Sequence, residues 1–461
     1  MKPTLVLSLL LVSASAVCYP KTNSLHNQNA KEMRQHRSAQ GDALSCWHAP
    51  CVLPNVLITA NQSSNTIVAA NPAKHAQLLA GVDSSYGGTC PFGSLDGGAS
   101  WYQDQAGRCA GSTPSLAYGT KSTAYQVGGG YNSAIEITST SDNGNAWTTP
   151  VIAVSQLFSY GSVETPWITI DNSSSSPYKG SLYVAATQLG NSSLDTEISL
   201  SYSRDGGNTW TIQPVDSIQV EPSVDHYSRV AVASDGTVYV TWQRCEMLGR
   251  NVNCGGTKAH MWLSKSTDGG NTWSTPVRVA TVTLVPDSCH CAFFGNLPHT
   301  TDPVANPPLI AVDNSGGPNV GSVYVVIYNW VSQQMRLELY ASRDGGSTWE
   351  KPVWVASPYT NDEFFPGLAV SETGVVGVSW LDRRNDPHDV FYQPFAAVST
   401  DGGKSFGTNY QLARPRSNPY YSSYSMGDYT GNAWAGKTLF VTWPDTRNQA
   451  MQDYVGGLLT K

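Results

Sequence analysis

The octapeptide Ser203-Arg204-Asp205-Gly206-Gly207-Asn208-Thr209-Trp210 decides the fold of this chain. Its pattern, Ser-x-Asp-x-Gly-x-Thr-Trp, predicts a clipped turn that we name the Asp box. The Asp carboxylate accepts hydrogen bonds from backbone N–H groups, glycine supplies positive φ, and Trp packs beneath the loop. Close copies run from Ser266 to Trp273 and Ser342 to Trp349, with looser ones at Ser94 to Trp101, Thr140 to Trp147 and Ser399 to Phe406.

The spacing of the boxes indicates the size of the repeating unit. Successive box aspartates, which we expect to be structural, are separated by 46 to 76 residues and are Asp96, Asp142, Asp205, Asp268, Asp344 and Asp401. This period suits a four-stranded blade of a β-propeller. The sequence therefore predicts an all-β propeller built from Asp-box blades.

A second repeated phrase shows the inner strands of each blade. An apolar segment such as Val230 to Ala233 is followed by a polar turn and then by a strand such as Thr237 to Trp242. Alternation of this kind is typical of half-buried strands. Six further copies occur at Thr66 to Val82, Leu116 to Tyr131, Trp167 to Ala186, Leu309 to Val326, Leu368 to Trp380 and Ala433 to Trp443.

Seven such units stand against six boxes, and the mismatch predicts how the ring closes. After Trp443 only one more strand fits, from Tyr454 to Leu459, so the last blade lacks an outer strand. The segment Val52 to Ala60 would supply it, because closure removes the open sheet edges. We expect seven blades, with six as the alternative.

Composition and the N-terminus indicate a secreted protein with one folded domain. The chain has 42 Gly, 23 Tyr and 14 Trp in 461 residues with 13% charged residues, which suits many short strands and tight turns. Residues 1–16 have the pattern of a signal peptide, with an apolar run too short to span a membrane. We expect residues 17–45 to be disordered or a pro-segment and residues 46–461 to form a single propeller. The destination would be extracellular, with periplasm or cell surface as alternatives.

Charge and cysteines limit the possible partners. A net charge of −7 argues against a nucleic-acid surface, and we expect a monomer that does not insert into membranes. Beyond Cys18 the chain has eight cysteines, which suits an oxidising compartment. Cys46 with Cys51 and Cys90 with Cys109 would form local bridges. For Cys245, Cys254, Cys289 and Cys291 we favour disulfides over a metal site at Cys289-His290-Cys291, and we expect no cofactor, although a structural calcium ion stays open.

These repeats resemble the Asp-box propellers of the sialidase superfamily. The phrases at 164–168, 427–431 and 443–447 resemble in particular the secreted bacterial-type sialidase family proteins, over residues 52–461. The resemblance implies a seven- or six-bladed propeller with its boxes on the face opposite the pocket. It also implies a carbohydrate or glycoconjugate as partner. The Phe/Tyr-Arg-Ile-Pro motif of sialidases is missing, so sialic acid itself is not implied.

The resemblance also suggests roles for particular residues. A sialidase uses three arginines on the substrate carboxylate, a Tyr nucleophile activated by Glu, and an Asp acid/base. The catalytic candidates are Tyr429 or Tyr227, Glu221, Asp225 and His226. The substrate-binding candidates are Arg229, Arg384, Arg447, Asp382, Asp445 and Tyr424. Structural alternatives remain, because Asp382 and Asp445 each stand two residues before an arginine and would pair with it, and Asp225-His226 would be a hydrogen-bonded loop pair.

Three classes of function stay open. A sialidase-like exo-glycoside hydrolase for an acidic sugar, or a polysaccharide lyase, predicts one central pocket with converging carboxylates, Tyr and Arg. A carbohydrate-binding or adhesive propeller predicts shallow sites repeated between blades. A protein-binding scaffold predicts a polar face without a pocket. The pocket-face loops differ most between blades, which favours a single asymmetric site and therefore the hydrolase.

Overall fold

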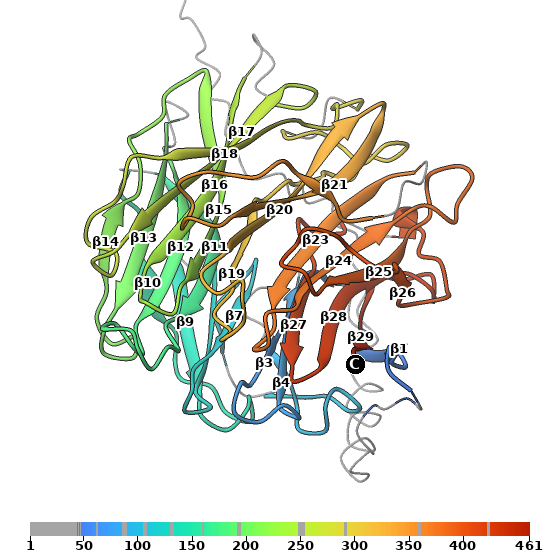
Figure 1. Ribbon diagram of the computed structural model, residues 1–461, viewed down its shortest axis with the longest axis horizontal. Coiled ribbons are helices and arrows are strands. Elements are labelled where there is room, and N and C mark those ends of the chain that lie inside the picture. Colours follow the sequence, from blue (N-terminus) through green and yellow to red (C-terminus); the bar gives the residue numbers. More distant parts are fainter. Residues whose placement is uncertain are drawn as a thin grey trace, which may run out of the picture.

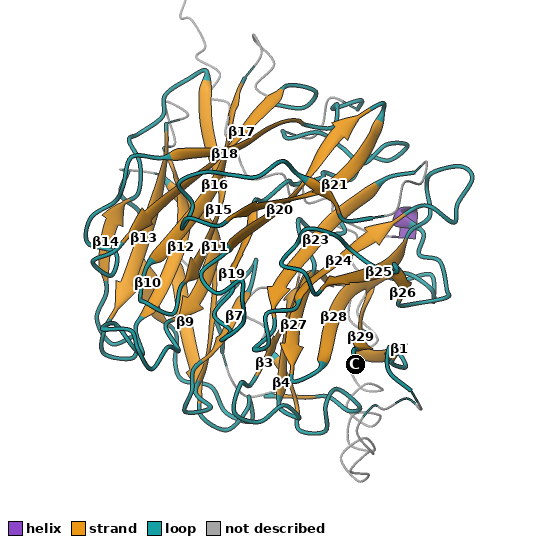
Figure 2. Cartoon of the chain, viewed as in Figure 1, coloured by secondary structure: helices purple, strands orange, loops and turns teal. Residues whose placement is uncertain are grey.

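The computed structural model describes residues 44, 46, 48–60, 63–84, 90–104, 108–129, 133–158, 161–190, 195–247, 254–289, 293–356, 361–421 and 425–461. Their strands form seven antiparallel sheets around one axis, which confirms seven blades. In Figure 1 the innermost strand of each sheet lies toward the centre. Figure 2 shows strands and loops, with one helical turn, η3 (Pro419–Tyr421). The predicted signal peptide and most of residues 17–45 lie outside the described residues and stay predictions.

Six blades have four strands in sequence order from the axis outward. They are β3 (Ser63–Ala70), β4 (Leu78–Ser84), β5 (Phe92–Ser94) and β6 (Tyr102–Gln103); β7 (Ser115–Tyr118), β8 (Ala124–Gly129), β9 (Ile135–Thr140) and β10 (Val151–Val154); β11 (Ser162–Ile170), β12 (Leu182–Leu189), β13 (Thr196–Ser203) and β14 (Thr211–Pro214); β15 (Ser223–Val232), β16 (Val238–Glu246), β17 (Lys258–Ser266) and β18 (Val277–Thr283); β19 (Leu309–Val312), β20 (Val323–Val331), β21 (Gln334–Ser342) and β22 (Val353–Trp354); and β23 (Glu363–Val370), β24 (Val376–Asp382), β25 (Gln393–Ser399) and β26 (Tyr410–Gln411).

The seventh blade joins both ends of the chain. Its strands β27 (Gly431–Ala435), β28 (Thr438–Asp445) and β29 (Gln452–Leu459) are completed by β1 (Cys51–Val52) and β2 (Val56–Thr59), which both pair with β29. Val56 lies opposite Val455, and Cys51 opposite Leu459. Figure 1 shows the C-terminus beside β1. The predicted closure by a segment within Val52 to Ala60 is confirmed.

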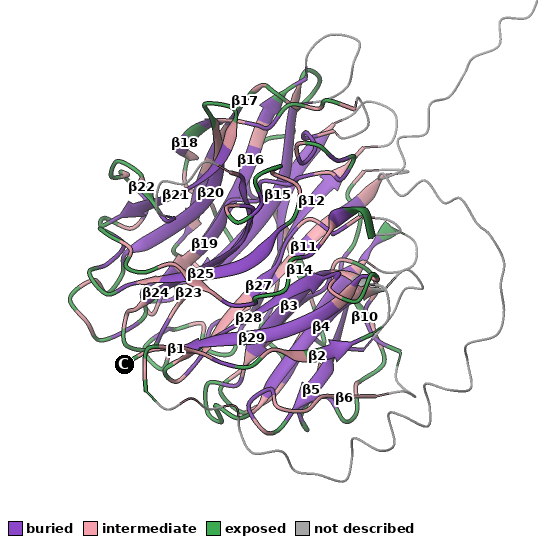
Figure 3. Ribbon diagram, turned by 90° about the vertical axis from the view of Figure 1, so that its right-hand side faces the viewer, coloured by how far each residue is buried: buried purple, intermediate pink, exposed green. Residues whose placement is uncertain are grey.

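Each Asp box lies where expected, in the turn between the third and fourth strands. Inner strands end at the same face as third strands, because consecutive strands are antiparallel. The opposite face, where inner strands begin, is named the pocket face below, and the other the Asp-box face. Figure 3 shows the strands buried and the exposed residues concentrated in loops. The core therefore lies between the blades and leaves the loops free to differ.

The box at 342–349 shows why the motif is repeated from blade to blade. Asp344 Oδ1 accepts from the N–H of Thr348 at 2.9 Å, and Oδ2 accepts from the Thr348 hydroxyl at 2.6 Å. The buried Ser342 hydroxyl donates to Asp344 at 2.8 Å and accepts from the N–H of Gly346 at 2.8 Å. Serine and aspartate together satisfy the donors of a turn that has no regular ladder.

Two disulfides join the predicted partners, and a third joins two of the four cysteines whose pairing the sequence left open. Cys46 is bonded to Cys51, Cys90 to Cys109, and Cys245 to Cys254. Cys289 is disulfide-bonded too, so its sulfur supplies no thiolate to a metal ion. His290 and Cys291 lie outside the described residues. No helix of the described part is long and apolar enough to cross a membrane.

We predict that Ser342→Ala lowers the free energy of unfolding by about 1–3 kcal/mol, because it leaves the buried N–H of Gly346 without an acceptor. The exposed Ser347 of the same box is the matched control, and Ser347→Ala should change stability by less than about 0.5 kcal/mol. Denaturant titrations of both variants test this. Equal losses would mean that the buried serine has no special role in the box.

The box aspartates should also make stability depend on acid. Hydrogen bonds from the Thr348 hydroxyl and from backbone N–H groups lower the pKa of Asp344 to about 2. A carboxyl whose pKa falls on folding stabilises the protein above its unfolded pKa of about 4, and this contribution is lost as the pH falls toward the folded pKa. We predict that the stability difference between wild type and Asp344→Asn shrinks below about pH 4. A difference that stays constant in acid would contradict it.

Candidate functional site

The inner strands of four blades carry the same β-bulge near the pocket face. The register of β3, β11, β15 and β23 shifts there against the second strand. At each bulge one non-glycine residue has positive φ, namely Asn65 (50°), Thr165 (51°), Tyr227 (57°) and Phe365 (46°). A bulge redirects side chains and costs backbone energy, and such features gather at functional sites.

The residue before each bulge lies at an equivalent position in its blade. Glu164 stands three residues before Trp167, and His226 three residues before Arg229. Asp428 has the same place in the last blade, three residues before Gly431. Gly431 pairs with a threonine of β28, and Arg229 pairs with a threonine of β16. Each of these threonines directly precedes a tryptophan. One geometric position thus brings a glutamate, a histidine and an aspartate to the pocket face near the axis.

These three residues, with Asp83 and Arg229, form what we name the axial cluster. His226 Nε2 lies 3.6 Å from Glu164 Oε2. Asn65 joins the other members, since its Oδ1 accepts from the N–H of Asp428 at 2.5 Å and its Nδ2 donates to Asp83 at 3.2 Å. The Glu164 and His226 side chains keep 28% and 11% of their surface exposed. The cluster is therefore shielded but reachable.

Burial changes the acidity of two carboxyl groups in the axial cluster. It raises the pKa of Asp428, against the opposing influence of His226 and Arg229, and Glu164 raises it further. Burial also raises the pKa of Asp83 to about 6, with Asp428 adding to the shift and a hydrogen bond from Asn65 opposing it. Carboxyls of raised pKa beside a histidine and a second carboxyl are the components of general acid–base catalysis.

Aromatic rings hold the cluster in place. The His226 ring lies 4.3 Å from that of Tyr227 and 5.1 Å from that of Phe294, between ring centroids. The guanidinium of Arg229 lies 4.3 Å from the centroid of the Trp167 ring and 5.6 Å from that of Tyr429. Of the residues expected at the site from the sequence, His226 and Arg229 lie in the axial cluster. Glu164 and Asp428 lie in the phrases 164–168 and 427–431 that carry the family resemblance, but the sequence did not single them out as site residues.

Tyr429 lies at the site, but not as an activated nucleophile. Its hydroxyl donates to the carbonyl of Pro114 at 2.8 Å, and its ring meets Trp167 edge-on. Burial raises the pKa of Tyr429 well above its ordinary value. Burial does the same to Tyr227. A nucleophilic tyrosine needs the opposite shift, so the structure gives no support to the expected role of Tyr429.

Two more catalytic candidates lie away from the cluster. Glu221 is exposed and stands before β15, so it does not approach Tyr429 as a base would. Asp225 is fully buried, and Arg244 binds both of its oxygens at 2.6 and 2.7 Å. Adjacent strand residues face opposite sides, so Asp225 points away from the side that His226 takes. Tyr424 lies outside the described residues.

The expected arginine triad does not form. Arg384 donates to Asp382 at 2.5 Å, and Arg447 donates to Asp445 at 2.6 Å. In both blades the same aspartate also accepts the indole N–H of a tryptophan two residues earlier, at 2.6 Å from Trp380 and 2.8 Å from Trp443. Trp-x-Asp-x-Arg is therefore a clamp at the end of a second strand, which is the structural alternative raised above. Only Arg229 reaches the axis.

A second group of carboxyls surrounds a buried arginine between two blades. Arg383 is fully buried, lies 3.6 Å from Asp362 and donates to the carbonyl of Pro298 at 2.9 Å. Burial raises the pKa of Asp362 to about 8 and that of Asp302 to about 6. These carboxyls are almost fully enclosed, with at most 7% of the residue exposed. Arg383 serves as their counter-ion, so we interpret these buried carboxyls and Arg383 as a structural group.

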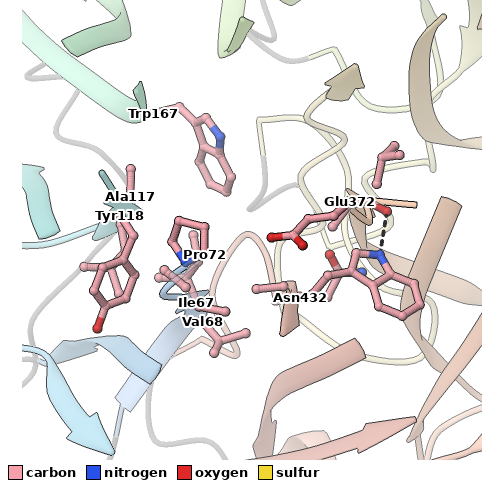
Figure 4. Close-up of a pocket in the computed structure, with 15 residues that line it drawn as sticks. Ile67, Val68, Pro72, Ala117, Tyr118, Trp167, Glu372 and Asn432 are labelled. Atoms are coloured by element: carbon pink, nitrogen blue, oxygen red, sulfur yellow. Dashed lines mark hydrogen bonds between the residues drawn. The ribbon is translucent and has the colours of Figure 1, made fainter. Parts of the chain in front are cut away.

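The channel along the axis holds two connected cavities. The larger has a volume of about 320 Å³ and lies toward the Asp-box face. Figure 4 shows Trp167, Ile67 and Pro72 around this space, with the Glu372 carboxylate projecting toward it. The smaller, of about 70 Å³, lies deeper, against Arg229 and Thr430. Ile67, Trp167 and Asn432 line both.

No metal site is evident in the described part of the chain, where no three His, Cys, Asp or Glu side chains are grouped to hold an ion. The calcium ion left open above thus gains no ligand set among these residues. The carboxyls of the axial cluster face a histidine and an arginine instead.

Comparison with known proteins identifies the repeats. Residues 120–378 match the model of the BNR repeat-like domain family. No curated protein sequence matches the chain. Among solved structures, the NanB sialidase of Streptococcus pneumoniae is 11% identical, with a TM-score of 0.45 over 74% of this chain and 67% of that one. An α-L-arabinofuranosidase of Fusarium graminearum is 11% identical, with a TM-score of 0.44 over 75% and 92%.

A protein of unknown function from Dyadobacter fermentans is 12% identical, with a TM-score of 0.47 over 87% of this chain and 99% of that one. Identities and TM-scores as low as these leave the chemistry of this chain to be argued from its own residues.

We predict that Arg384→Gln destabilises the fold without altering ligand binding by the folded protein. The side chains of Arg384 and Asp382 are only 6% and 1% exposed, so the change leaves a buried carboxylate unpaired. Breaking such a pair costs about 3–5 kcal/mol. The double variant Asp382→Asn/Arg384→Gln should recover much of the loss in thermal denaturation. Weaker binding by a fully folded Arg384→Gln protein would instead place this arginine in the ligand site.

Proposed function

The chain belongs to the BNR repeat-like domain family, and from this premise we propose that it is a secreted glycan-acting enzyme, a glycoside hydrolase whose site is the axial cluster. The observation that carries the proposal is the convergence of Glu164, His226 and Asp428 from one equivalent position in three blades. Arginine–aspartate pairs hold charges elsewhere in the blades, whereas here His226 contacts Glu164 at 3.6 Å and the Asp428 carboxylate has no ion pair among the described residues. The disulfides suit the oxidising compartment that secretion implies.

The chemistry would follow the two-carboxylate scheme rather than the tyrosine scheme of sialidases. Most glycoside hydrolases protonate the leaving oxygen with one carboxylic acid and assist attack with a second carboxylate. Asp428 suits the acid, because burial raises its pKa and so keeps a proton available. Glu164 suits the second role, since it is the more exposed member of the cluster and faces His226. His226, 3.6 Å from Glu164, would orient it.

The arrangement of charges favours a neutral sugar as the substrate over an acidic one. Binding a carboxylate strongly takes guanidinium groups aimed at it in pairs. Arg384 and Arg447 are held by Asp382 and Asp445, which leaves only one of the three guanidinium groups, that of Arg229 beside the smaller cavity. The carboxyls of Glu164, Asp428 and Asp83 at the pocket-face end of the channel would repel an anionic substrate. The acidic-sugar preference suggested by the sequence therefore loses its support.

A non-catalytic carbohydrate-binding propeller remains the second candidate, because of one observation. Tyr420 and Tyr421 in η3 are 63% and 43% exposed, which is unusual for large aromatic residues. Exposed tyrosines provide flat apolar surfaces with a polar edge, which suits stacking against sugar rings. In that case the ligand would be retained unchanged, and the axial cluster would have a structural role only.

We predict that Glu164→Gln and Asp428→Asn each lower kcat by about 10²-fold or more, because each removes a proton-transfer group. A glycan-array screen would first identify a substrate. The sugars released from that substrate would then be measured over time. Glu221→Gln is the matched control, since this exposed glutamate lies outside the cluster and its loss should leave the rate unchanged. With Asp428 as the acid, the rate should fall as the pH rises through its raised pKa. Binding without any released product would favour the carbohydrate-binding alternative.

A further inference from the structure

Arg229 is a buried cation with no carboxylate in contact, and Asp428 of the same cluster acts on it only from a longer distance. Only 1% of this residue is exposed, and among the described residues no carboxylate oxygen lies within 4.0 Å of its guanidinium. Its Nη1 donates to the carbonyl of Ser228 at 2.8 Å, while Nε has no acceptor. A guanidinium stays protonated in proteins, so a full positive charge is enclosed here.

The neighbours of Arg229 compensate this charge only in part. The faces of Trp167 and Tyr429 attract a cation, but they do not accept its N–H groups as an anion would. Every other strongly buried arginine described above, such as Arg383 or Arg384, has a carboxylate within 4.0 Å. Buried charges are normally paired. Arg229 departs from this rule, and its side chain borders the smaller cavity.

The cavity against Arg229 sets the size of what could pair with it. It encloses about 70 Å³, and Thr430 and Asn432 also line it. Those two side chains donate their hydrogens elsewhere, Thr430 to the carbonyl of Phe365 at 2.8 Å and Asn432 to Ser379 at 3.1 Å. Sites for drug-sized ligands have volumes of about 300–1,000 Å³, whereas a cavity holds one water molecule from about 10–15 Å³ upward. The space therefore suits a small ion with a few water molecules and is too small for a sugar.

We propose that Arg229 binds a small monovalent inorganic anion, a halide or nitrate, inside the channel. The anion would enter from the Asp-box face, since the cavity of about 320 Å³ shares wall residues with the smaller one and reaches the exposed Glu372. The site adjoins the axial cluster through Arg229, and the proposal holds whether or not Glu164 and Asp428 are catalytic. Chloride would be the occupant in ordinary saline.

Crystals of the unmodified full chain soaked in sodium bromide give the direct test. We expect an anomalous peak within contact distance of the Arg229 guanidinium, in the channel. Bromide peaks confined to the protein surface, with water or nothing beside Arg229, would overturn the proposal. This test needs no variant, so it stands even if changes at Arg229 prevent folding.

A solution test uses the melting temperature in sodium chloride against sodium gluconate of equal ionic strength, because gluconate is too large for the cavity. A ligand that binds only the native state raises the melting temperature with its concentration. We expect this rise in wild type and in Arg108→Met, a control that removes an exposed arginine with 52% of its side chain accessible. Arg229→Met should lose it. A chloride effect that survives in Arg229→Met would contradict the assignment.

Discussion

The contact between one blade and the Asp box of the next is the constraint on which the rest of the molecule depends. The second strand of a blade carries a ring that lies under the neighbouring box, and the second box glycine leaves room for it. At Gly403 φ is +80°, and a side chain there would come within 3.2 Å of the Tyr324 ring and 2.6 Å of Leu339. Tyr239 and Tyr183 occupy the corresponding places below Gly346 and Gly270. Glycine is thus required by its backbone conformation and by its neighbour together.

Long cations reinforce the same contacts. Arg343 donates to the carbonyl of Gly402 in the next box at 2.6 Å, and Lys265 donates to that of Gly345 at 2.7 Å. Arg204 makes the equivalent bond to Gly269. Three successive blades are therefore joined to the next blade at the Asp-box face by packing and by charge-assisted hydrogen bonds. The pocket face carries none of these box contacts, so its loops and bulges are free to differ between blades.

This division explains what could be predicted from the sequence. The boxes, the inner strands and the closing segment follow local rules of turn chemistry and alternation, and they led to the right number of blades. The site depends on which residues meet across the axis. Arg384 and Arg447 looked equivalent to Arg229 along the chain, yet their own Asp382 and Asp445, two residues away, hold them. The dipeptides Thr165-Pro166 and Phe365-Pro366 lie at two of the bulges and are a sequence signal for the position of Glu164.

Geometry also explains why a buried arginine without a contacting carboxylate lies on the axis. A residue between two blades has packed neighbours on both sides, so a charge there must find a partner, as Arg244 does with Asp225 and Arg383 with Asp362. A residue on an inner strand has sheet on one side only and faces the channel on the other. Such a residue can be buried by the ring as a whole and still border open space. The axis is therefore a region of this fold where a shielded acid, base or cation remains available to a ligand.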